Sequence, residues 1–409
     1  MIALPLDEVA TLAPGQLERT PWASEITGVQ VDSRRIVEGD LFVALGPGAD
    51  FCKHALARGA AATLVPDDAF AALGAIAGAV RDASSAKVIG ITGSMGKTST
   101  KDFLAALCAP SARTIAAEAS FNNEIGVPLT LCRLEPDTEI CVLELSMRGF
   151  GQIAELCEFA RPEVGVITNV GPVHLELVET LEGVIRAKGE LIAALPAGGT
   201  AIVPGDFPVD REDLRVIRLG QPEGKVDGDR TVVAGVSFNF VAEHQVANAA
   251  AALAALDALG LSRPDGVDVD FSRWRGEEHE LPGGGLLIND AYNANPVSMR
   301  AALGYLAARA GERRRVAILG DMAELGRTAP DYHREVGEAA AELGVEELLA
   351  VGELARGYVD GAAGVPSRWL PNVHEALREL DELVRPGDAV LVKGSRAMGL
   401  EAVAEALAS

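Results

Sequence analysis

The segment KVIGITGSMGKTSTKDFLAALC, residues 87–108, places a glycine-rich loop between an apolar run and an amphipathic one. Its first six residues are predicted to form a buried strand and its last twelve a helix. Gly93 and Gly96 let backbone amides approach a phosphate, Lys97 adds a positive charge, and Thr98 offers a hydroxyl to Mg²⁺. The start of the helix adds its dipole. The sequence therefore predicts a phosphate-binding loop at the end of a strand.

The glycine spacing of this loop is unusual. A Walker A loop has a glycine five positions before the glycine of its GK pair, and that position is Ile91 here. A glycine-rich turn that merely caps a helix is the alternative. The strand, loop and helix in succession favour phosphate binding.

The regular alternation of strand-like and helix-like runs around the loop predicts an α/β fold with three domains. Strands separated by helices of this length form a mostly parallel sheet covered on both faces. The central sheet is predicted to contain residues 87–92, 113–117, 139–145, 164–170 and 199–203. We predict a small N-terminal α/β domain, a central P-loop-type ATPase domain and a C-terminal Rossmann-like α/β domain, at residues 1–82, 83–271 and 272–409. In residues 205–240 the apolar runs are short and irregular, and they predict no regular element.

The charge and apolar composition of the chain argue against nucleic acid and membrane as partners. The chain of 409 residues carries 36 basic and 59 acidic side chains, a net charge of −23, which repels nucleic acid. No signal peptide and no apolar run of about 18 residues is present, so we expect a cytoplasmic protein without membrane insertion. The five cysteines form no metal-ligand pattern and are expected to be buried apolar residues.

Polar residues follow the predicted central strands, where ligands bind in such sheets. Asn122 and Asn123 could instead cap the helix that follows them. Glu144 leaves a buried strand where a cation could pair with it, although it could also cap the sheet. His174 follows the next strand along the chain, and we place it beside Glu144, although a lone histidine is more often structural. Lys188, by its residue type alone, reads as a surface lysine.

Two candidates lie near the end of the predicted central domain. Asn248 is polar in an otherwise apolar helix, so it caps, faces solvent or presents an amide to a ligand. Arg275 lies where two predicted domains meet and could reach a phosphate, although most linker arginines are solvated.

In the C-terminal domain, a polar segment follows each of three predicted strands. They are the segments DAYNANP at 290–296, DMAELG at 321–326 and KGSR at 393–396. Asn295 before Pro296 is also a sound helix cap. Because the ends of parallel strands meet at one edge, we expect a second ligand-facing rim.

Together these segments resemble the Mur ligase superfamily, the ATP-dependent amide-forming enzymes of peptidoglycan synthesis and their folate-polyglutamating relatives. The motifs that carry the resemblance are GSMGKTSTK, FNNEIGVPLTL, ELSMRGFGQIAEL, VITNVGPVHLE, AKGEL, NAAAALAAL, INDAYNANPVSMRAAL, LGDMAELG and VLVKGSR, over residues 88–400. Within the superfamily they are most similar to the ligases that add D-Ala-D-Ala to UDP-MurNAc-tripeptide. VDSR at 31–34 resembles, more weakly, part of the domain that holds the uridine nucleotide.

The resemblance implies a role for each candidate. ATP would contact Gly93, Ser94, Met95, Gly96, Lys97, Thr98, Ser99, Asn248, Arg275, Asp290, Asn293 and Asn295. Mg²⁺ would be held by Thr98, Glu144, His174 and a carbamylated Lys188. The catalytic residues would be Lys97, His174, Lys188, Lys393 and Arg396. The substrates would contact Ser33, Arg34, Asn122, Asn123, Ser146, Arg148, Asp321, Glu324 and Ser395.

The implied reaction uses ATP to convert the tripeptide carboxylate to an acyl phosphate, which the amine of D-Ala-D-Ala attacks. Its product serves the cell wall, and thereby cell shape and division. We expect a monomer. A related ligase that acts on another carboxylate and amine, and a nucleotide-binding module without turnover, remain alternatives. Departures from the family pattern are the short segment 203–244, Gly48-Ala49-Asp50-Phe51 and the pair His244-Gln245.

Overall fold

The computed structural model describes residues Met1–Ser409, which form two compact units. The first unit contains Met1–Asn169, Ile185–Val241 and Gln245–Asp270. The second contains Val170–Val184, Ala242–His244 and Phe271–Ser409. None of the helices combines the length and the apolar composition that crossing a bilayer requires.

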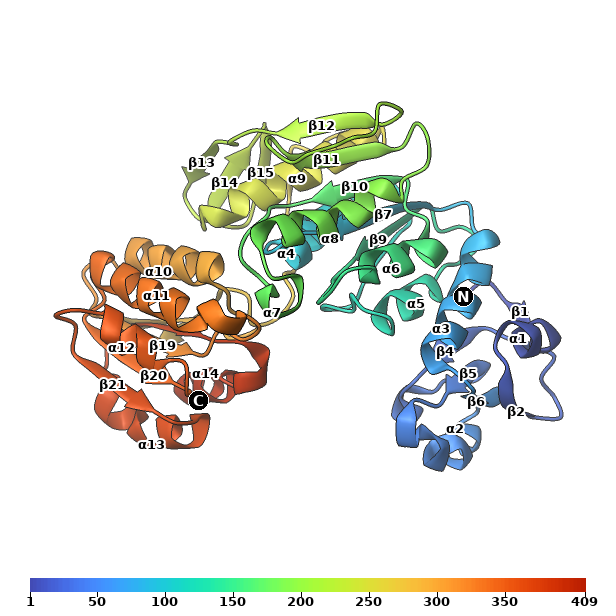
Figure 1. Cartoon of the computed structure of the whole chain (residues 1–409), viewed down its shortest axis with the longest axis horizontal. Coiled ribbons are helices and arrows are strands. Elements are labelled where there is room, and N and C mark those ends of the chain that lie inside the picture. The colour runs from blue at the N-terminus through green and yellow to red at the C-terminus, as the bar shows by residue number, and fades with distance from the viewer. The chain divides into compact units, whose positions relative to one another are not determined.

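The first unit is built on a parallel sheet of six strands, which confirms the predicted parallel sheet (Figure 1). Its order is β12-β11-β10-β7-β9-β8. The strands are β7 (Lys87–Thr92), β8 (Thr114–Ala116), β9 (Ile140–Glu144), β10 (Val164–Ile167), β11 (Thr200–Pro204) and β12 (Arg215–Leu219). The five predicted strands are all present, whereas β12 was not predicted because its largely exposed residues show no clear alternation.

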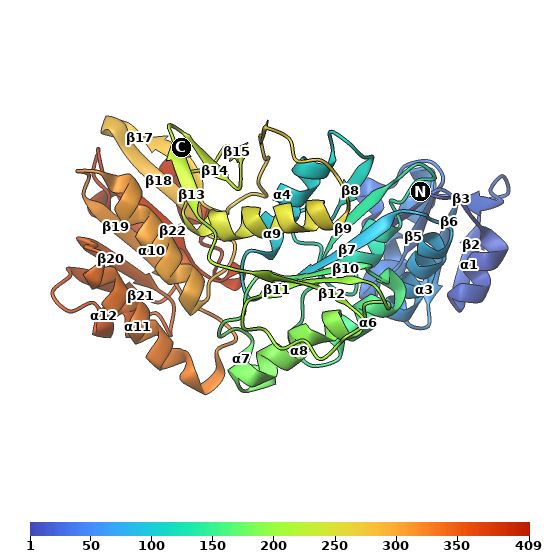
Figure 2. The same ribbon diagram turned by 90° about the horizontal axis from the view of Figure 1, so that it is seen from above.

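Helices cover both faces of this sheet, which is why its strands read as continuous apolar runs. In Figure 2, α4 and α9 lie on one face and α6 and α8 on the other. The helices are α4 (Lys97–Cys108), α5 (Gly126–Leu131), α6 (Gln152–Ala160), α8 (Leu181–Ala193) and α9 (His244–Ala258). The predicted strand and helix on either side of the glycine-rich loop are confirmed as β7 and α4.

The N-terminal part of the first unit carries a separate four-stranded sheet of order β2-β6-β5-β4. Its elements are β2 (Gly15–Arg19), β4 (Gly28–Gln30), β5 (Asp40–Val43), β6 (Ala62–Pro66), α2 (Cys52–Ala57) and α3 (Ala69–Asp82), with α1 (Leu6–Leu12), β1 (Leu4–Pro5) and β3 (Glu25–Ile26) beside it. Helix α3, which was not predicted, packs against α5 and α6.

The second half of the stretch that reads as irregular in the sequence forms, together with β16, a small sheet of order β13-β14-β15-β16. Its strands are β13 (Gly224–Asp227), β14 (Arg230–Val233), β15 (Val236–Phe238) and β16 (Gly266–Val267). Phe238 and Phe240 meet Phe103 of α4 edge to face, with ring centroids 5.2 and 5.4 Å away. This aromatic cluster anchors the small sheet to the helix that follows the glycine-rich loop.

The second unit is a mainly parallel sheet between two layers of helices. Its order is β17-β18-β22-β19-β20-β21, with only the β17–β18 pair antiparallel. The strands are β17 (Glu277–Leu281), β18 (Gly285–Asp290), β19 (Arg315–Gly320), β20 (Glu347–Val351), β21 (Ser367–Leu370) and β22 (Ala389–Lys393). The helices are α10 (Pro296–Ala310), α11 (Ala329–Glu342), α12 (Arg356–Gly361), α13 (Val373–Leu383) and α14 (Glu401–Ala408), with α7 (Leu175–Val178) from the middle of the chain.

Successive residues of each strand face opposite layers of this unit. On β18, Leu286 and Ile288 pack with α10 and α11, whereas Leu287 packs with α13 and α14. The fold class predicted from the sequence, mixed α/β around parallel sheets, is therefore confirmed.

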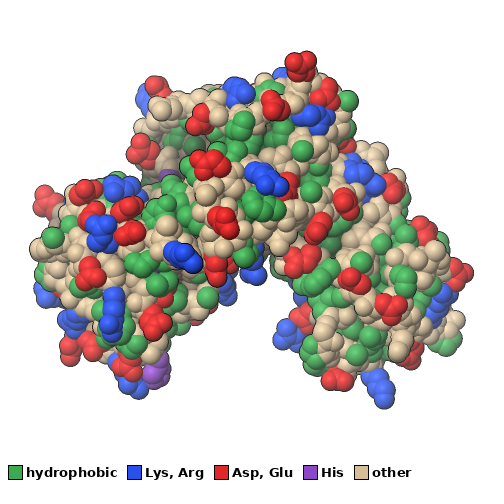
Figure 3. Space-filling view, viewed as in Figure 1, with side chains coloured by type: hydrophobic (Ala, Val, Ile, Leu, Met, Phe, Trp, Pro, Cys, Tyr) green, Lys and Arg blue, Asp and Glu red, His purple; other side chains and the backbone are tan.

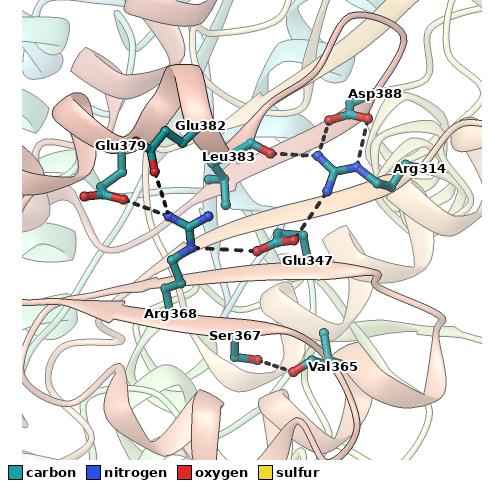
Figure 4. A network of polar contacts seen from close by, with 9 residues as sticks. All are labelled: Arg314, Glu347, Val365, Ser367, Arg368, Glu379, Glu382, Leu383 and Asp388. Atoms are coloured by element: carbon teal, nitrogen blue, oxygen red, sulfur yellow. Dashed lines mark hydrogen bonds and ion pairs between the residues drawn. The ribbon is translucent and has the colours of Figure 1, made fainter.

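A network of ion pairs closes the edge of this sheet where its parallel strands begin (Figure 4). Arg314, just before β19, donates to both carboxylate oxygens of Asp388 at 3.1 and 2.6 Å and also to Glu347. Arg368 pairs with Glu379 at 2.8 Å. Because these groups satisfy one another, this edge is structural, and the opposite edge is the one available to ligands.

Candidate active site

At two positions in the loop between β7 and α4, only glycine fits the backbone conformation and the space available. Gly93 and Gly96 have φ angles of 151° and 78°. A Cβ atom would lie 1.9 Å from Thr168 Oγ1 at Gly93 and 2.1 Å from Asn248 Oδ1 at Gly96. The two glycines thus create the close backbone approach that a phosphate cradle needs.

Two residues that follow β10 hold this loop in place. Asn169 Oδ1 accepts hydrogen bonds from the Ser94 and Met95 N–H groups at 3.1 and 3.0 Å. Thr168 Oγ1 donates to the Met95 carbonyl at 2.6 Å, and Lys97 Nζ donates to the Gly93 carbonyl at 2.9 Å. The predictions from sequence assigned no role to Thr168 or Asn169, although their place directly after the neighbouring strand was a usable signal.

Glu144 forms an oxygen-rich corner beside the loop. It ends β9, opposite Ile91 of β7, and is 1% exposed. Its Oε2 accepts from Thr98 Oγ1 at 2.6 Å and its Oε1 from Asn122 Nδ2 at 2.8 Å. A carboxylate and a hydroxyl are ligands that Mg²⁺ prefers, so this donor set fits a magnesium ion. Three of the predicted residues are thereby brought together.

Lys188 is a buried lysine rather than a surface one. It lies on α8 and is 2% exposed. Burial, together with the positive charge of Lys97, lowers the pKa of its ammonium well below the usual value. A neutral amine in this position is a nucleophile.

A row of polar side chains on α9 borders the loop. Asn248 Nδ2 donates to Gln245 Oε1 at 2.8 Å, and Gln245 Nε2 donates to Ser99 Oγ at 3.4 Å. Because Asn248 also faces Gly96, the polar residue of this apolar helix lies at the phosphate loop, where an amide could meet a nucleotide.

The remaining predicted residues of the first unit have local partners. Asn123 Oδ1 accepts from the N–H of Gly126, the first residue of α5, at 3.0 Å. The Ser146 N–H donates to the Asn122 carbonyl, and Arg148 is exposed.

Ser33 and Arg34 lie in a short turn of the N-terminal part. Ser33 Oγ is 3.0 Å from His54 Nδ1. Arg34 pairs with Asp32 at 2.7 Å, and its hydrogen bonds to that carboxyl hold the Asp32 pKa at about 2.

In the second unit, Lys393 lies at the edge of the sheet where the parallel strands end. It is 2% exposed, and its Nζ donates to Asp290 Oδ2 at 2.6 Å and to the Asn293 carbonyl at 2.8 Å. Strands β18, β22 and β19 are neighbours, so the ends that carry Asp290, Lys393 and Asp321 meet as predicted. Asn295 Oδ1 accepts from the Ser298 N–H in a capping box that starts α10.

The loop after β19 is tied on several sides. Asp321 Oδ1 accepts from the Ala355 N–H at 2.7 Å, and Ser395 Oγ accepts from the Ala323 N–H at 2.8 Å. Glu324 forms a short hydrogen bond with His174 Nδ1. His174 belongs to the second unit and Glu144 to the first, so their sharing of one metal ion stays a prediction.

His333 hydrogen-bonds to the loop after β19. No role for this residue was predicted from the sequence. Its Nε2 accepts from the Met322 N–H at 2.9 Å, so Nδ1 carries the proton and donates to the Ala329 carbonyl at 2.6 Å. Burial lowers the pKa of the imidazole, which favours this neutral form.

The predicted arginines of the second unit stack on aromatic rings. The Arg275 guanidinium lies 4.2 Å from the centre of the Tyr292 ring, and its buried Nε has no hydrogen-bond partner. Arg396 lies 4.5 Å from the Trp274 ring and pairs with Glu401. Such stacking fixes the guanidinium planes while leaving N–H groups free to bind anions.

Known proteins match the chain over nearly its whole length. Residues 91–256 match the Mur ligase middle domain, and residues 274–396 match the Mur ligase, glutamate ligase domain. The UDP-N-acetylmuramoyl-tripeptide–D-alanyl-D-alanine ligase of Synechocystis is 34% identical, over 93% of this chain and 92% of that protein. The ligase of the same name from Escherichia coli is 32% identical, over 100% and 99%.

Solved structures agree with these sequence matches. MurF from Acinetobacter baumannii superposes with a TM-score of 0.87 at 29% identity and covers 99% of both chains. MurF from Thermotoga maritima, solved in complex with ADP, superposes with a TM-score of 0.78 at 26% identity, over 93% of this chain and 97% of that one.

Proposed function

Since the chain belongs to the Mur ligase family, and within it to the UDP-N-acetylmuramoyl-tripeptide–D-alanyl-D-alanine ligases, we propose that it joins D-Ala-D-Ala to UDP-MurNAc-tripeptide at the expense of ATP. The single observation that carries the proposal is the glycine cradle between β7 and α4, with Lys97 at its side and the Thr98–Glu144 pair at its end. The product is a precursor of peptidoglycan.

The reaction begins with transfer of the γ-phosphoryl group of ATP to the tripeptide carboxylate. In our proposal the amides of Ser94 and Met95 turn from Asn169 to the phosphates, and Lys97 offsets the charge on the transferring group. The amine of D-Ala-D-Ala then attacks the acyl phosphate, and phosphate leaves. Water must be kept from the acyl phosphate, because hydrolysis would waste it.

A magnesium ion would neutralise phosphate charge during this transfer. Thr98 and Glu144 supply its nearest oxygen ligands in our proposal, with His174 completing the set. A neutral Lys188 amine can add to carbon dioxide and release a proton to solvent, and the resulting carbamate anion would support the metal. The low pKa and the burial of Lys188 support this modification.

The substrates occupy the remaining predicted residues in this proposal. Residues 1–82 form the domain that holds the uridine nucleotide, with Ser33 and Arg34 in contact with it. Asn122, Asn123, Ser146 and Arg148 face the muramoyl peptide. Residues 83–271 bind ATP, and residues 272–409 bring Lys393, Ser395, Arg396, Asp321 and Glu324 to the reacting groups. We further propose that the chain acts as a monomer in the cytoplasm.

Replacing Lys97 tests the phosphate-loop assignment. Lys97→Ala is expected to lower the rate of ATP turnover by about 100-fold or more, because a charge on the transferring phosphoryl group is lost. Lys87→Ala, at an exposed lysine on the first residue of β7, is the matched control and is expected to retain full turnover. Circular dichroism checks that both variants fold. Near-normal turnover in a folded Lys97→Ala protein would contradict the assignment.

A further inference from the structure

Lys101 is a buried cation for which the proposed reaction has no use. It lies on α4, one turn beyond Thr98, and is 3% exposed. Its Nζ pairs with Asp102 Oδ1 at 2.8 Å and donates to the carbonyls of Ala117 and Ala119 at 2.8 and 3.0 Å. These three acceptors match the three N–H donors of an ammonium group. Burying a charge is costly, so a lysine kept here with full hydrogen bonding points to a specific task.

The two carbonyls belong to the loop that joins β8 to α5, residues 117–125. Ala119 has a φ of 45°, which a residue other than glycine adopts only when its surroundings hold it. At the far end of the loop, a Cβ atom on Gly126 would lie 2.5 Å from the Phe121 backbone, so the loop packs tightly onto the start of α5. Lys101 thus holds the near end of a loop whose far end is fixed by packing.

This loop delivers Asn122 to the metal-site carboxylate. Asn122 Nδ2 donates to Glu144 Oε1, while Thr98 donates to Glu144 Oε2. Thr98 and Lys101 are three residues apart, so they share one face of α4. One face of α4 therefore orients both carboxylate oxygens of Glu144. Thr98 acts directly on Oε2, and Lys101 acts on Oε1 through the loop that carries Asn122.

We propose that Lys101 is a positioning residue for the magnesium site, which sets Asn122 against Glu144 through the carbonyls of Ala117 and Ala119. This role rests on the proposed function only for the identity of the ligand. Removing a residue that hydrogen-bonds to a metal ligand typically lowers metal affinity about 10- to 100-fold. The effect of Lys101 is therefore expected in Mg²⁺ binding and in the order of the loop.

A matched control touches the same loop from the solvent side. Arg133 donates to the Ala116 carbonyl at 3.0 Å and pairs with Glu118 at 3.5 Å, and its side chain is 44% exposed. An exposed pair of this kind contributes little to stability. Arg133→Ala therefore removes a contact to the loop without removing the buried cation.

The first experiment needs no nucleotide. Hydrogen exchange of the peptide spanning residues 117–122 is measured in the ligand-free full-length protein. Lys101→Met, which keeps the length of the side chain, is expected to speed exchange about 10-fold, and Arg133→Ala to leave it nearly unchanged. Unchanged exchange in Lys101→Met would overturn the link between Lys101 and the loop.

The second experiment measures the Mg²⁺ dependence of ADP binding by calorimetry. Lys101→Met is expected to raise the Mg²⁺ concentration for half-maximal binding about 10-fold. In an Asn122→Ala background the same replacement is expected to add almost nothing, because both changes remove one interaction. Additive effects, or a lower melting temperature with unchanged Mg²⁺ dependence, would overturn the positioning role. If Lys101→Met does not fold, Lys101→Gln, which keeps an amide donor, is carried through the same cycle.

The two proposals fail in different ways. If the unmodified protein binds ADP without any dependence on Mg²⁺, the proposed function and the role of Lys101 are both overturned. If the unmodified protein shows that dependence and Lys101→Met retains it unchanged, only the role of Lys101 is overturned.

Discussion

Lys188 shows how the environment of one residue reverses the meaning of its type. In sequence it resembles any lysine on a helix, but in the structure it is buried and the pKa of its ammonium is lowered by desolvation and by Lys97. Desolvation disfavours the charged form, so a larger fraction of the amine is neutral and available for reaction with carbon dioxide than in an exposed lysine.

The carbamate on Lys188 is directly observable. Protein equilibrated with ¹³C-bicarbonate is expected to show a carbamate carbonyl resonance that is absent from Lys188→Met. The same replacement is expected to lower the turnover of ATP at least 10-fold, since the metal loses a supporting anion. An identical resonance in the two proteins would contradict the assignment to Lys188.

His333 gives the stability of the second unit a dependence on pH. Its folded-state pKa is lowered by burial, so the unfolded chain binds a proton first as the pH falls below about 6.5. The stabilisation from His333 is therefore complete above about pH 6.5 and is lost as the pH falls toward the folded-state pKa. His244, whose pKa burial also lowers, acts in the same direction.

Replacing His333 with glutamine isolates this dependence. His333→Gln keeps an acceptor for the Met322 N–H but cannot be protonated. Urea unfolding between pH 5 and pH 7 is expected to show that the free-energy advantage of the unmodified protein shrinks as the pH falls, by at most about 1.4 kcal/mol per pH unit. A difference that stays constant across this range would contradict a neutral His333.

At the scale of single residues, the sequence was informative where chemistry and position coincide. Lys97, Thr98, Glu144 and Lys393 were predicted because a strand end or a glycine-rich loop marks them. Asn169 was missed, although it follows the strand next to β7, because its hydrogen bonds to the glycine-rich loop depend on the pairing of β7 with β10.

At the scale of elements, the close packing of α11 and α12 depends on small residues. A Cβ atom on Gly337 of α11 would lie 2.2 Å from the Tyr358 carbonyl of α12. Tyr358 in turn donates to the Gly320 carbonyl at 2.8 Å, at the start of the loop that carries Asp321. The glycine therefore lets α12 approach the sheet closely enough to support the site.

Two glycine-to-alanine replacements separate packing from helix propensity. Gly337→Ala is expected to lower the free energy of unfolding by about 1–3 kcal/mol, because the added methyl forces the helices apart. Gly304→Ala, in α10, has open space around its Cβ position and is expected to raise the free energy by about 0.5–1 kcal/mol. Chemical denaturation of both variants checks the prediction, and stabilisation by Gly337→Ala would contradict the packing account.

Some elements with a clear apolar pattern were predicted from the sequence, and others with an equally clear pattern were missed. The four inner strands of the parallel sheet stood out because helices bury both of their faces. Helix α11 was missed, although its buried residues Ala329, His333, Val336 and Ala340 recur at helical spacing. Helix α13 was also missed, although Ala376, Leu380 and Leu383 on its buried face were a sufficient signal. The small sheet from β13 to β16 gave no pattern because its strands are short and β13 is exposed.

At the scale of the whole chain, the net negative charge opposes the binding of anionic substrates. On the face drawn in Figure 3, acidic and basic side chains are interspersed over the surface. Although the chain carries a net charge of −23, its substrates are anions, so the local amides, Lys97 and a metal ion must overcome the global field. The predicted ligand-binding residues lie in both compact units, which is why neither unit is expected to catalyse the reaction alone.

The central claim is that this chain forms a peptide bond through an acyl phosphate. Its most direct test is to incubate the purified full-length protein with ATP, Mg²⁺, UDP-MurNAc-tripeptide and D-Ala-D-Ala, and to quantify the pentapeptide product by mass spectrometry together with released phosphate. The account predicts one UDP-MurNAc-pentapeptide for each phosphate released, and no product when D-Ala-D-Ala is omitted. Turnover only with a different carboxylate or amine, or binding of ATP without turnover for any acceptor, would contradict it.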